Sequence, residues 1–482
     1  MLPLLVMPGL AVLLTALSAK ADIASPLEIP DHVLWLEGAD FDGDGTADTG
    51  TSGTPLATWV DKSPGQGVNS VAVTGGAPTM QFGSSNAVRF TGGSEDKLDN
   101  ATLNVSGDYT VFTISQADAF AGSGHILSGL NSEGTDAVLY RNSGGGYNFY
   151  SGQSTGNVNH QFAVRPASAD FKLTGYQISS TGIDTAMYQS VQRPLDFGGP
   201  ATLNGIRIGN LDRDTPSSVI RPEAFNGQIA EVLVYNRQLT PVEISEVGQF
   251  LNAKYNLKAA FATGAATQIE TGNVSGGSPS TLNPGSAAFD GGRVNVGLAT
   301  NGGTAFSQNH IAPGNIRDFS ANRVNDGLYA DEPEGAPPIQ EPWIAGTQES
   351  FVGISLSGAT VIDRIAFETQ FADRRYGAVI MEYTTDSFSG ISIHSEEGLD
   401  PAGVDALNWS LIDVMQLADD ADTRHLYAFD PIDGVTGVRL RIEASAAEFA
   451  LSEIEIWAVP EAGSLALVLS AGLLLGRRQR RL

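Results

Sequence analysis

The chain has 482 residues, of which 27 are basic and 54 acidic, and its formal net charge is −27. This acidity argues against a nucleic-acid partner, because binding to phosphates requires clustered lysine and arginine. The absence of cysteine excludes disulfides, thiolate metal sites and cysteine nucleophiles. The length predicts two domains, and 56 glycines between short apolar runs favour strands joined by turns.

The first residues predict export. Residues 2–17 are apolar, and Ala19-Lys20-Ala21 follows with the small-x-small spacing that signal peptidase accepts. We expect cleavage after Ala21, so that residues 1–21 form a signal peptide. The alternative is a retained membrane anchor, since the basic segment that usually begins a signal peptide is missing.

Residues 31–258 predict a first all-β domain. Short runs with alternating or continuous apolar residues are separated by clusters of Gly, Asn, Asp and Ser. The predicted strands are His32 to Leu36, Ala87 to Phe90, Tyr109 to Ser115, Phe171 to Ile178, Gly205 to Ile208 and Gln228 to Tyr235. Many short strands at this spacing are typical of a β-sandwich or jelly roll.

One helix is expected at the end of this domain. Thr240 and Glu243 have the spacing of a capping box, and Pro241 stands at the first helical position. Four apolar residues then repeat at helical spacing, namely Ile244, Val247, Leu251 and Tyr255. We expect this apolar stripe to pack on the edge of the sandwich.

The two ends of the domain carry a family resemblance. The segments are LWL at 34–36 and WVDKS at 59–63 near the start, and FNGQIAEVLVYNR at 225–237 and LNAKY at 251–255 near the end. Together they resemble LamG-like, concanavalin A-like jelly rolls. The resemblance implies a two-sheet sandwich that binds glycans or proteins, often with calcium at a rim.

Residues 40–48 contain the sharpest chemical motif. Asp40, Asp42, Asp44 and Asp48 offer oxygens at mostly alternate positions, with glycines between them that allow a tight reversal. Calcium takes about six to eight oxygen ligands. A full EF-hand loop would have glutamate at its twelfth position, where this chain has Thr51. The motif predicts an isolated structural Ca²⁺ site formed by these four aspartates, and the alternative is a plain acidic turn.

The rest of the body predicts a linker and a second sandwich. Residues 259–283 are rich in Gly, Ala, Ser and Thr and show no sustained period, which predicts a flexible linker. Residues 284–458 are again rich in strand signals. The predicted strands are Ile354 to Leu356, Val361 to Glu368, Val379 to Tyr383, Trp409 to Val414, Gly437 to Glu443 and Leu451 to Trp457.

This second domain carries a resemblance of its own. The segments are NRVNDG at 322–327, WIAG at 343–346, VIDRI at 361–365, GVRLRI at 437–442 and LSEIEIW at 451–457. In this order they resemble discoidin, or coagulation factor 5/8 type C, domains. The resemblance implies a galactose-binding-like β-sandwich, a distorted barrel that binds carbohydrate or anionic lipid through loops at one end. Those loops vary within the family, so no ligand residue is transferred.

The C-terminal residues 459–482 have three parts. They begin Val-Pro-Glu-Ala, continue as an apolar run through Leu475 and end with Arg477-Arg478-Gln479-Arg480-Arg481. The layout resembles the PEP-CTERM sorting signal of Gram-negative bacteria, with Ala462 where the family has proline. It implies a short apolar transmembrane helix, its arginines on the cytoplasmic side, and processing by an exosortase-type enzyme. The alternative is an ordinary single-pass tail anchor.

Signals for catalysis are weak. GQSTG at 152–156 matches a nucleophile elbow, but no strand and helix are predicted around it, so Ser154 is interpreted as part of a surface turn. A laminarinase-type glycosidase needs E-x-D-x-x-E carboxylates along one strand, and the sequence has no such run. Glu453 and Glu455 alternate in the last strand, and we predict them to be solvated outer-face residues.

Five tryptophans raise the question of sugar stacking. Trp35, Trp343, Trp409 and Trp457 lie in or beside apolar strand runs, which favours packing in the core. The position of Trp59 favours neither interpretation.

The sequence thus predicts a non-catalytic, exported protein of the bacterial surface or extracellular matrix. Its two modules would bind polysaccharide or glycoconjugate, or surface proteins, and two linked sites would gain avidity. Contact with the membrane is expected only through the C-terminal segment. The alternatives are a structural matrix component that self-assembles and a glycoside hydrolase with an unrecognised carboxylate pair.

Overall fold

The computed structural model describes residues 23–459 apart from short gaps. The gaps are 64–67, 93–94, 119–123, 131–136, 142–145, 152–158, 165–169, 181–183, 196–201, 211–223, 258, 274–292, 309–323, 325–342, 346–349, 370–376, 395–397, 418–422 and 443–448. The predicted signal peptide, the GQSTG turn and the sorting tail with its apolar helix lie outside the described residues. Within the described ranges, no helix is long and apolar enough to cross a membrane.

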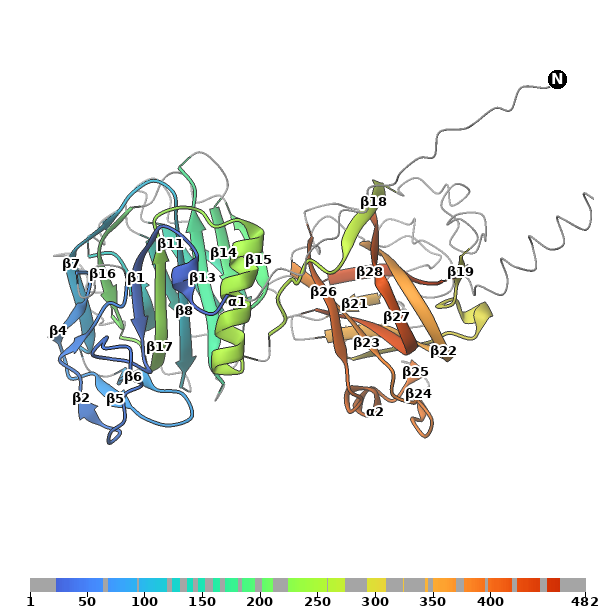
Figure 1. Ribbon diagram of the computed structural model, residues 1–482, viewed down its shortest axis with the longest axis horizontal. Coiled ribbons are helices and arrows are strands. Elements are labelled where there is room, and N and C mark those ends of the chain that lie inside the picture. Colours follow the sequence, from blue (N-terminus) through green and yellow to red (C-terminus); the bar gives the residue numbers. More distant parts are fainter. Residues whose placement is uncertain are drawn as a thin grey trace, which may run out of the picture.

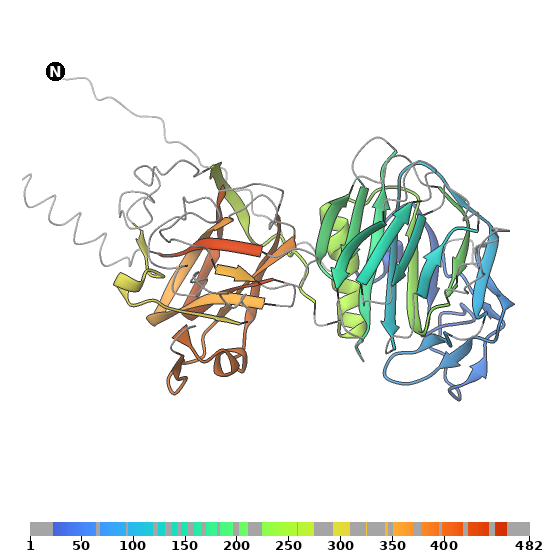
Figure 2. The same cartoon turned by 180° about the vertical axis from the view of Figure 1, so that it is seen from behind.

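Two all-β modules lie side by side along the long axis of the molecule (Figures 1 and 2). The first module comprises residues 23–257 and the second residues 267–459, and residues 259–266 form a connecting segment between them. The predicted fold class, all-β with β-sandwich domains, is confirmed.

The first module consists of two antiparallel sheets. In sheet A the strands follow the order β15 (Val191–Leu195), β14 (Asp184–Tyr188), β13 (Lys172–Ile178), β8 (Tyr109–Ala117), β17 (Gly227–Tyr235), β6 (Ala87–Phe90), β5 (Thr79–Gln81) and β2 (Thr54–Pro55), and β1 (His32–Glu37) also pairs with β17. In sheet B the order is β12 (Asn159–Val164), β11 (Gly146–Ser151), β10 (Ala137–Arg141), β9 (Gly124–Ser128), β16 (Leu203–Ile208), β7 (Lys97–Val105), β4 (Val71–Gly75) and β3 (Thr58–Trp59). A short 3-10 helix, η1 (Pro26–Glu28), precedes β1.

Alternation along the strands divides the apolar residues between two cores. Leu34 and Leu36 of β1 lie in the core between the sheets, together with Val232 and Val234 of β17. Trp35, which lies between the two leucines, points to the opposite face of sheet A. Successive strand residues point to opposite sides of a sheet. Both sides of sheet A are covered by other parts of the module, so its outer face is apolar as well.

The predicted helix covers that outer face. In α1 (Pro241–Tyr255) the capping box between Thr240 and Glu243 is present, which confirms the prediction. Its four predicted apolar residues are buried with residues of β8, β13 and β17, including Phe112, Leu173 and Leu233. The helix therefore packs on the face of sheet A, whereas the sequence predicted the edge. Its position follows from the apolar outer residues of the central strands, which offer a larger surface to bury than the edge.

The second module contains one large, strongly curved antiparallel sheet. Its main strands follow the order β24 (Ile393–His394), β25 (Gly398–Leu399), β20 (Thr304–Gln308), β22 (Ser350–Thr369), β27 (Thr423–Ile442), β23 (Gly377–Thr384) and β26 (Ser410–Leu417). β18 (Thr267–Asn273) pairs with β27, while β19 (Val294–Asn295), β21 (Trp343–Ala345) and β22 pair with β28 (Phe449–Ala458). The short helices η2 (Ala299–Asn301) and α2 (Pro401–Asp405) complete the module.

Two predicted strands of this module are parts of a single strand. The runs Ile354 to Leu356 and Val361 to Glu368 both belong to β22, which pairs with β27 on both sides of register shifts between Ser355 and Arg364. Irregular pairing of this kind bends a strand without ending it. The exposed small residues Ser357, Gly358 and Ala359 at the bend separate the two apolar runs in the sequence, which is why the sequence indicated two strands.

The connecting segment differs from the flexible linker predicted for residues 259–283. Ala259 and Phe261 are buried against the first module, and β18 is part of the sheet of the second. The rest of the predicted linker, residues 274–283, lies outside the described ranges. Small residues such as alanine occur both in closely packed segments and in flexible linkers, so the composition of residues 259–283 could not show which of these the segment is.

Candidate functional site

The acidic loop, residues 40–48, directly follows β1. Gly43 and Gly45 have φ angles of 71° and 86°, a left-handed conformation that residues with a side chain rarely adopt. A Cβ atom on Gly43 would also lie 2.7 Å from a methyl carbon of Val60. Both glycines are therefore needed for the reversal that the sequence predicted.

Backbone hydrogen bonds hold the loop in shape. Asp40 accepts from the N–H of Asp44 at 3.1 Å and from the N–H of Gly45 at 2.9 Å. Asp48 accepts from the N–H of Phe41 at 2.6 Å and so closes the loop at its other end. The loop thus has a defined conformation that its own side chains stabilise.

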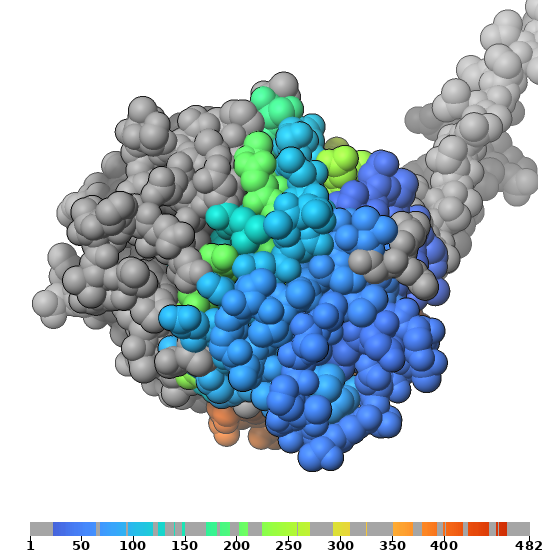
Figure 3. All heavy atoms as spheres, turned by 90° about the vertical axis from the view of Figure 1, so that its left-hand side faces the viewer, coloured from blue at the N-terminus to red at the C-terminus, as the bar shows by residue number. Residues whose placement is uncertain are grey.

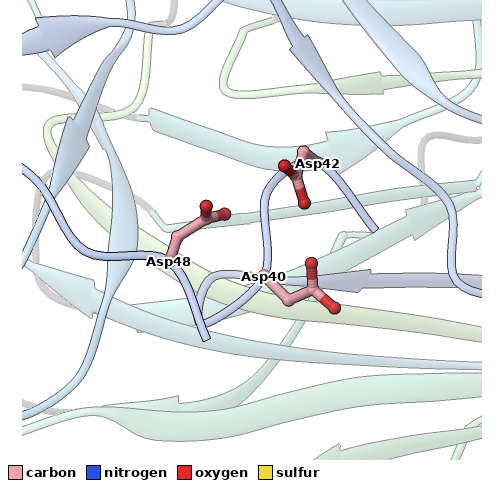
Figure 4. Close-up of side chains that lie close together, drawn as sticks. All are labelled: Asp40, Asp42 and Asp48. Atoms are coloured by element: carbon pink, nitrogen blue, oxygen red, sulfur yellow. The ribbon is translucent and has the colours of Figure 1, made fainter. Parts of the chain in front are cut away.

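Three of the four predicted ligands come together. Carboxylate oxygens of Asp40, Asp42 and Asp48 lie within 4.8 Å of one another, and Figure 4 shows the three side chains around one region of the loop. Asp44 is not part of this group, and its carboxylate accepts from the N–H of Thr46 at 2.7 Å. An oxygen-only donor set at this spacing fits the preference of Ca²⁺.

Charges around the loop shift two of its pKa values. At the exposed Asp42, the hydrogen bond from the Asp44 N–H lowers the pKa, but desolvation and the carboxylates of Asp48, Asp44 and Asp40 outweigh it, and the pKa is raised. At Asp40, burial alone would raise the pKa, but bonds from Lys62 and from backbone N–H groups lower it. The loop therefore concentrates negative charge that a cation would relieve.

Lys62 connects the loop to a buried ionic network. Its ammonium group lies 2.8 Å from Asp40 Oδ2 and also bonds Glu37, the last residue of β1. Glu37 is bonded by Lys254 of α1 at 2.5 Å, and Lys254 in turn lies 2.6 Å from Glu231 of β17. Alternating charges thus run from the acidic loop to the helix.

Trp35 lies within this network. Its indole Nε1 donates to Glu231 at 2.8 Å, and the Lys62 ammonium lies 4.6 Å from the centre of its ring. Tyr255 donates its hydroxyl to the same glutamate at 2.6 Å. Sequence reasoning did not predict this network, although Trp35, Lys62, Glu231, Lys254 and Tyr255 lie in the segments LWL, WVDKS, FNGQIAEVLVYNR and LNAKY on which the family resemblance rests.

The acids of the last strand have a structural role. Glu453 and Glu455 of β28 are both 0% exposed, so the prediction that they are solvated is wrong. Arg424 of β27 donates to both oxygens of Glu455, at 2.7 and 2.6 Å, and the Nε1 of Trp457 donates at 3.0 Å. The alternating pattern correctly placed both residues on one face of β28, but Arg424 reaches Glu455 across the intervening strand β22, and this ion pair allows the carboxylate to be buried.

Tryptophans occupy core positions wherever their side chains are described. Trp59, for which the sequence left both interpretations open, is 0% exposed and donates to the carbonyl of Glu37 at 2.9 Å. Trp35 and Trp457 are buried, and the half-buried Trp409 stacks under the guanidinium of Arg439 at 4.4 Å.

Comparisons with known proteins give matches only among solved structures. No family model matches the chain, and no curated protein matches it. A chitosan-binding module of a Paenibacillus chitosanase/glucanase is 14% identical, with a TM-score of 0.24, over 34% of this chain and 98% of that one. Domain 4 of an extracellular arabinanase from Geobacillus stearothermophilus, solved with arabinotriose, is 16% identical, with a TM-score of 0.29, over 45% of this chain and 98% of that one.

An enzyme is also among these structures. Trypanosoma rangeli sialidase is 12% identical, with a TM-score of 0.31, over 47% of this chain and only 33% of the sialidase. Carbohydrate-binding modules and glycosidases are thus both represented, and the all-β fold of this chain rests on its own strands.

Proposed function

We propose that this protein is a non-catalytic, carbohydrate-binding protein of the bacterial surface or matrix, whose first module carries a structural Ca²⁺ ion on its acidic loop. The observation that carries the calcium site is the convergence of Asp40, Asp42 and Asp48 on a loop that is already held in shape. The carbohydrate ligand, a polysaccharide or glycoconjugate, is supported by the resemblance of the two modules to LamG-like and discoidin domains.

Three buried glutamates support the proposed non-catalytic role. Glu231, Glu455 and Glu382 are buried and bonded to lysine or arginine, so they contribute to the folded structure. The acidic loop, by contrast, belongs to the N-terminal part of the chain that forms much of the outer end of the first module (Figure 3). Calcium at this position would offset the repulsion between the three carboxylates and stabilise the loop without taking part in a reaction.

A calcium titration of the full chain tests the metal site. Calorimetry should show binding, and thermal melting should show a higher melting temperature with calcium. The free energy of unfolding should rise by about 2.7 kcal/mol when the ion is at 100 times its Kd. Asp42→Asn should abolish both effects. Asp433→Asn is a matched control, because Asp433, in β27 of the second module, is also an exposed aspartate that accepts a backbone bond, from Gly434. Absence of heat and of any shift in the parent protein would exclude the site.

Retention on immobilised polysaccharides and a glycan array test the ligand. We expect the full chain to bind at least one carbohydrate or envelope fraction. No retention on any of them, combined with concentration-dependent self-association, would favour a structural matrix component. Hydrolysis of a bound glycan that is lost on mutation of two acids would instead make the protein a glycosidase.

Export and sorting are part of the same proposal. We expect the mature protein to begin at Asp22 and to lose its C-terminal segment through an exosortase-type enzyme. N-terminal sequencing and intact-mass measurement of the protein from cell fractions check both ends. Recovery of the uncut chain from the cytoplasm would contradict the proposal.

A further inference from the structure

An apolar sheet face of the second module is turned away from its core. In the pair β23–β26, Ala378 lies opposite Gln416 and Ile380 lies opposite Val414. Val379, next to both Ala378 and Ile380 in the chain, belongs to the core of the module, so Ala378 and Ile380 point outward. Ala378 and Ile380 are nevertheless 0% exposed and Val414 is 3% exposed. Another part of the protein must therefore cover this face.

The cover is supplied by the first module and the connecting segment. Val191, at the start of β15, is 4% exposed and packs in one cluster with Ala378, Ile380 and Val414. Ala260 and Ala262 of the connecting segment complete the cluster. Figures 1 and 2 show β15 and α1 on the side of the first module that faces the second, opposite β26.

Hydrogen bonds surround this apolar contact. The Gln416 side chain donates to the carbonyl of Ser190 at 2.6 Å and accepts from the N–H of Gln192 at 3.1 Å, so one amide bonds the residues on both sides of Val191. Gln189, whose φ of 53° forms the turn before β15, is itself fixed to the first module, because its side chain donates to the carbonyl of Leu257 at 3.0 Å. The turn that carries Val191 is thus bonded to both modules.

The first module also holds the connecting segment. Phe261 packs directly over Gly248 of α1, where a Cβ atom would lie 2.3 Å from the phenylalanine ring. Gln249, the next residue of the helix, donates to the carbonyl of Ala262 at 2.8 Å. Glycine is unfavourable inside a helix, by roughly 1 kcal/mol relative to alanine, and this close packing gives its presence a physical reason.

The second module holds the other end of the same segment. Asp413 of β26, which is 1% exposed, accepts from the N–H of Thr263 at 2.7 Å and from the N–H of Ala266 at 2.8 Å. β18 begins at the following residue, Thr267. Along the connecting segment, the residues up to Ala262 contact the first module, and the residues from Thr263 onwards contact the second.

From these contacts we infer that the two modules form one rigid unit, locked by Val191, Gln416 and the connecting segment. Domains joined by a small interface usually move relative to each other, and free chain between them permits that motion. Here the chain from Phe261 to Ala266 is bonded to one module or the other. On the proposed carbohydrate-binding function, a ligand that contacts both modules would meet them at a fixed separation and orientation, without the cost of ordering a linker.

The absence of cysteine allows a direct test by spin labelling. Val242 and Val294 are 54% and 51% exposed, lie in the first and the second module, and do not belong to the apolar cluster of the contact. We would label the full chain at Val242→Cys and Val294→Cys and measure the distance distribution by pulsed electron–electron double resonance. A rigid unit predicts one narrow distribution.

Variants of the contact then test its residues. Val191→Asp introduces a charge into the apolar cluster and should broaden the distribution and shift its mean. Val68→Asp is the matched control, because Val68 is 69% exposed, and it should leave the distribution unchanged. Gln416→Ala removes only the bonds around Val191 at an exposed side chain and serves as a milder variant, and circular dichroism checks that every variant is folded.

Two results would overturn the inference. The first is a broad distribution in the parent chain, which would mean that the modules move independently. The second is a narrow distribution that remains unchanged in folded Val191→Asp and in Gln416→Ala, which would mean that other contacts fix the orientation.

Discussion

Removal of the Glu231 carboxylate is expected to destabilise the first module severely. Its side chain is 1% exposed and receives three bonds, from Trp35 Nε1, Tyr255 OH and Lys254 Nζ. Glu231→Leu leaves these donors without their acceptor and leaves Lys254 with Glu37 alone. Breaking a buried ion pair on one side costs about 3–5 kcal/mol.

Differential scanning calorimetry of the full chain measures this loss. For a module of this size, about 3–5 kcal/mol corresponds to a decrease of roughly 10 °C in the melting temperature of the first module. Glu28→Gln is the control, because Glu28 is an exposed glutamate of η1 in the same module, and its change should stay within about 0.5 kcal/mol.

A double variant separates the cost of an unpaired charge from the value of the pair. Glu231→Leu combined with Lys254→Met removes both charges, and we expect it to recover part of the lost stability, because well-packed apolar residues often replace a buried pair without loss. The reasoning is refuted if Glu231→Leu costs less than about 1 kcal/mol, or if the double variant is less stable than the sum of its two single variants predicts.

Three further outcomes are expected. Burial lowers the pKa of His32 from 6.5 to about 4, against the opposing effect of the Asp61 charge, so the unfolded chain binds a proton at His32 more readily than the folded chain. The resulting contribution to the free energy of unfolding, at most about 3 kcal/mol, is complete above pH 6.5 and is lost as the pH falls towards 4. Chemical denaturation of His32→Gln across this range should therefore show a weaker pH dependence than the parent protein. Arg424→Met leaves the buried Glu455 carboxylate without its cation and should cost about 3–5 kcal/mol in the second module by calorimetry, while a smaller loss in the double variant with Glu455→Leu would support the same cause. Glu243→Ala removes the capping box of α1 and a partly buried ion pair with Arg237, and should cost about 1 kcal/mol in urea denaturation; no measurable change would mean that packing alone fixes the helix end.

Structural features formed by residues close together in the chain could be predicted from the sequence alone. The capping box at Thr240 requires only Glu243 three residues later, and the structure contains it. The acidic loop likewise closes through bonds between residues that are at most seven positions apart. Strands such as β6 and β17 were predicted nearly to the residue, because alternation and flanking turn residues are local signals.

Features that depend on distant residues were decided by the tertiary structure. Glu455 is buried because Arg424 of β27, which is separated from β28 by β22, bonds both of its oxygens, and no local pattern specifies that partner. Glu231 and Trp35 are 196 positions apart in the chain and meet only because β1 pairs with β17. The connecting segment is ordered for the same reason, since a run of small residues becomes fixed only when Asp413 and the surface of α1 are brought to it by the fold.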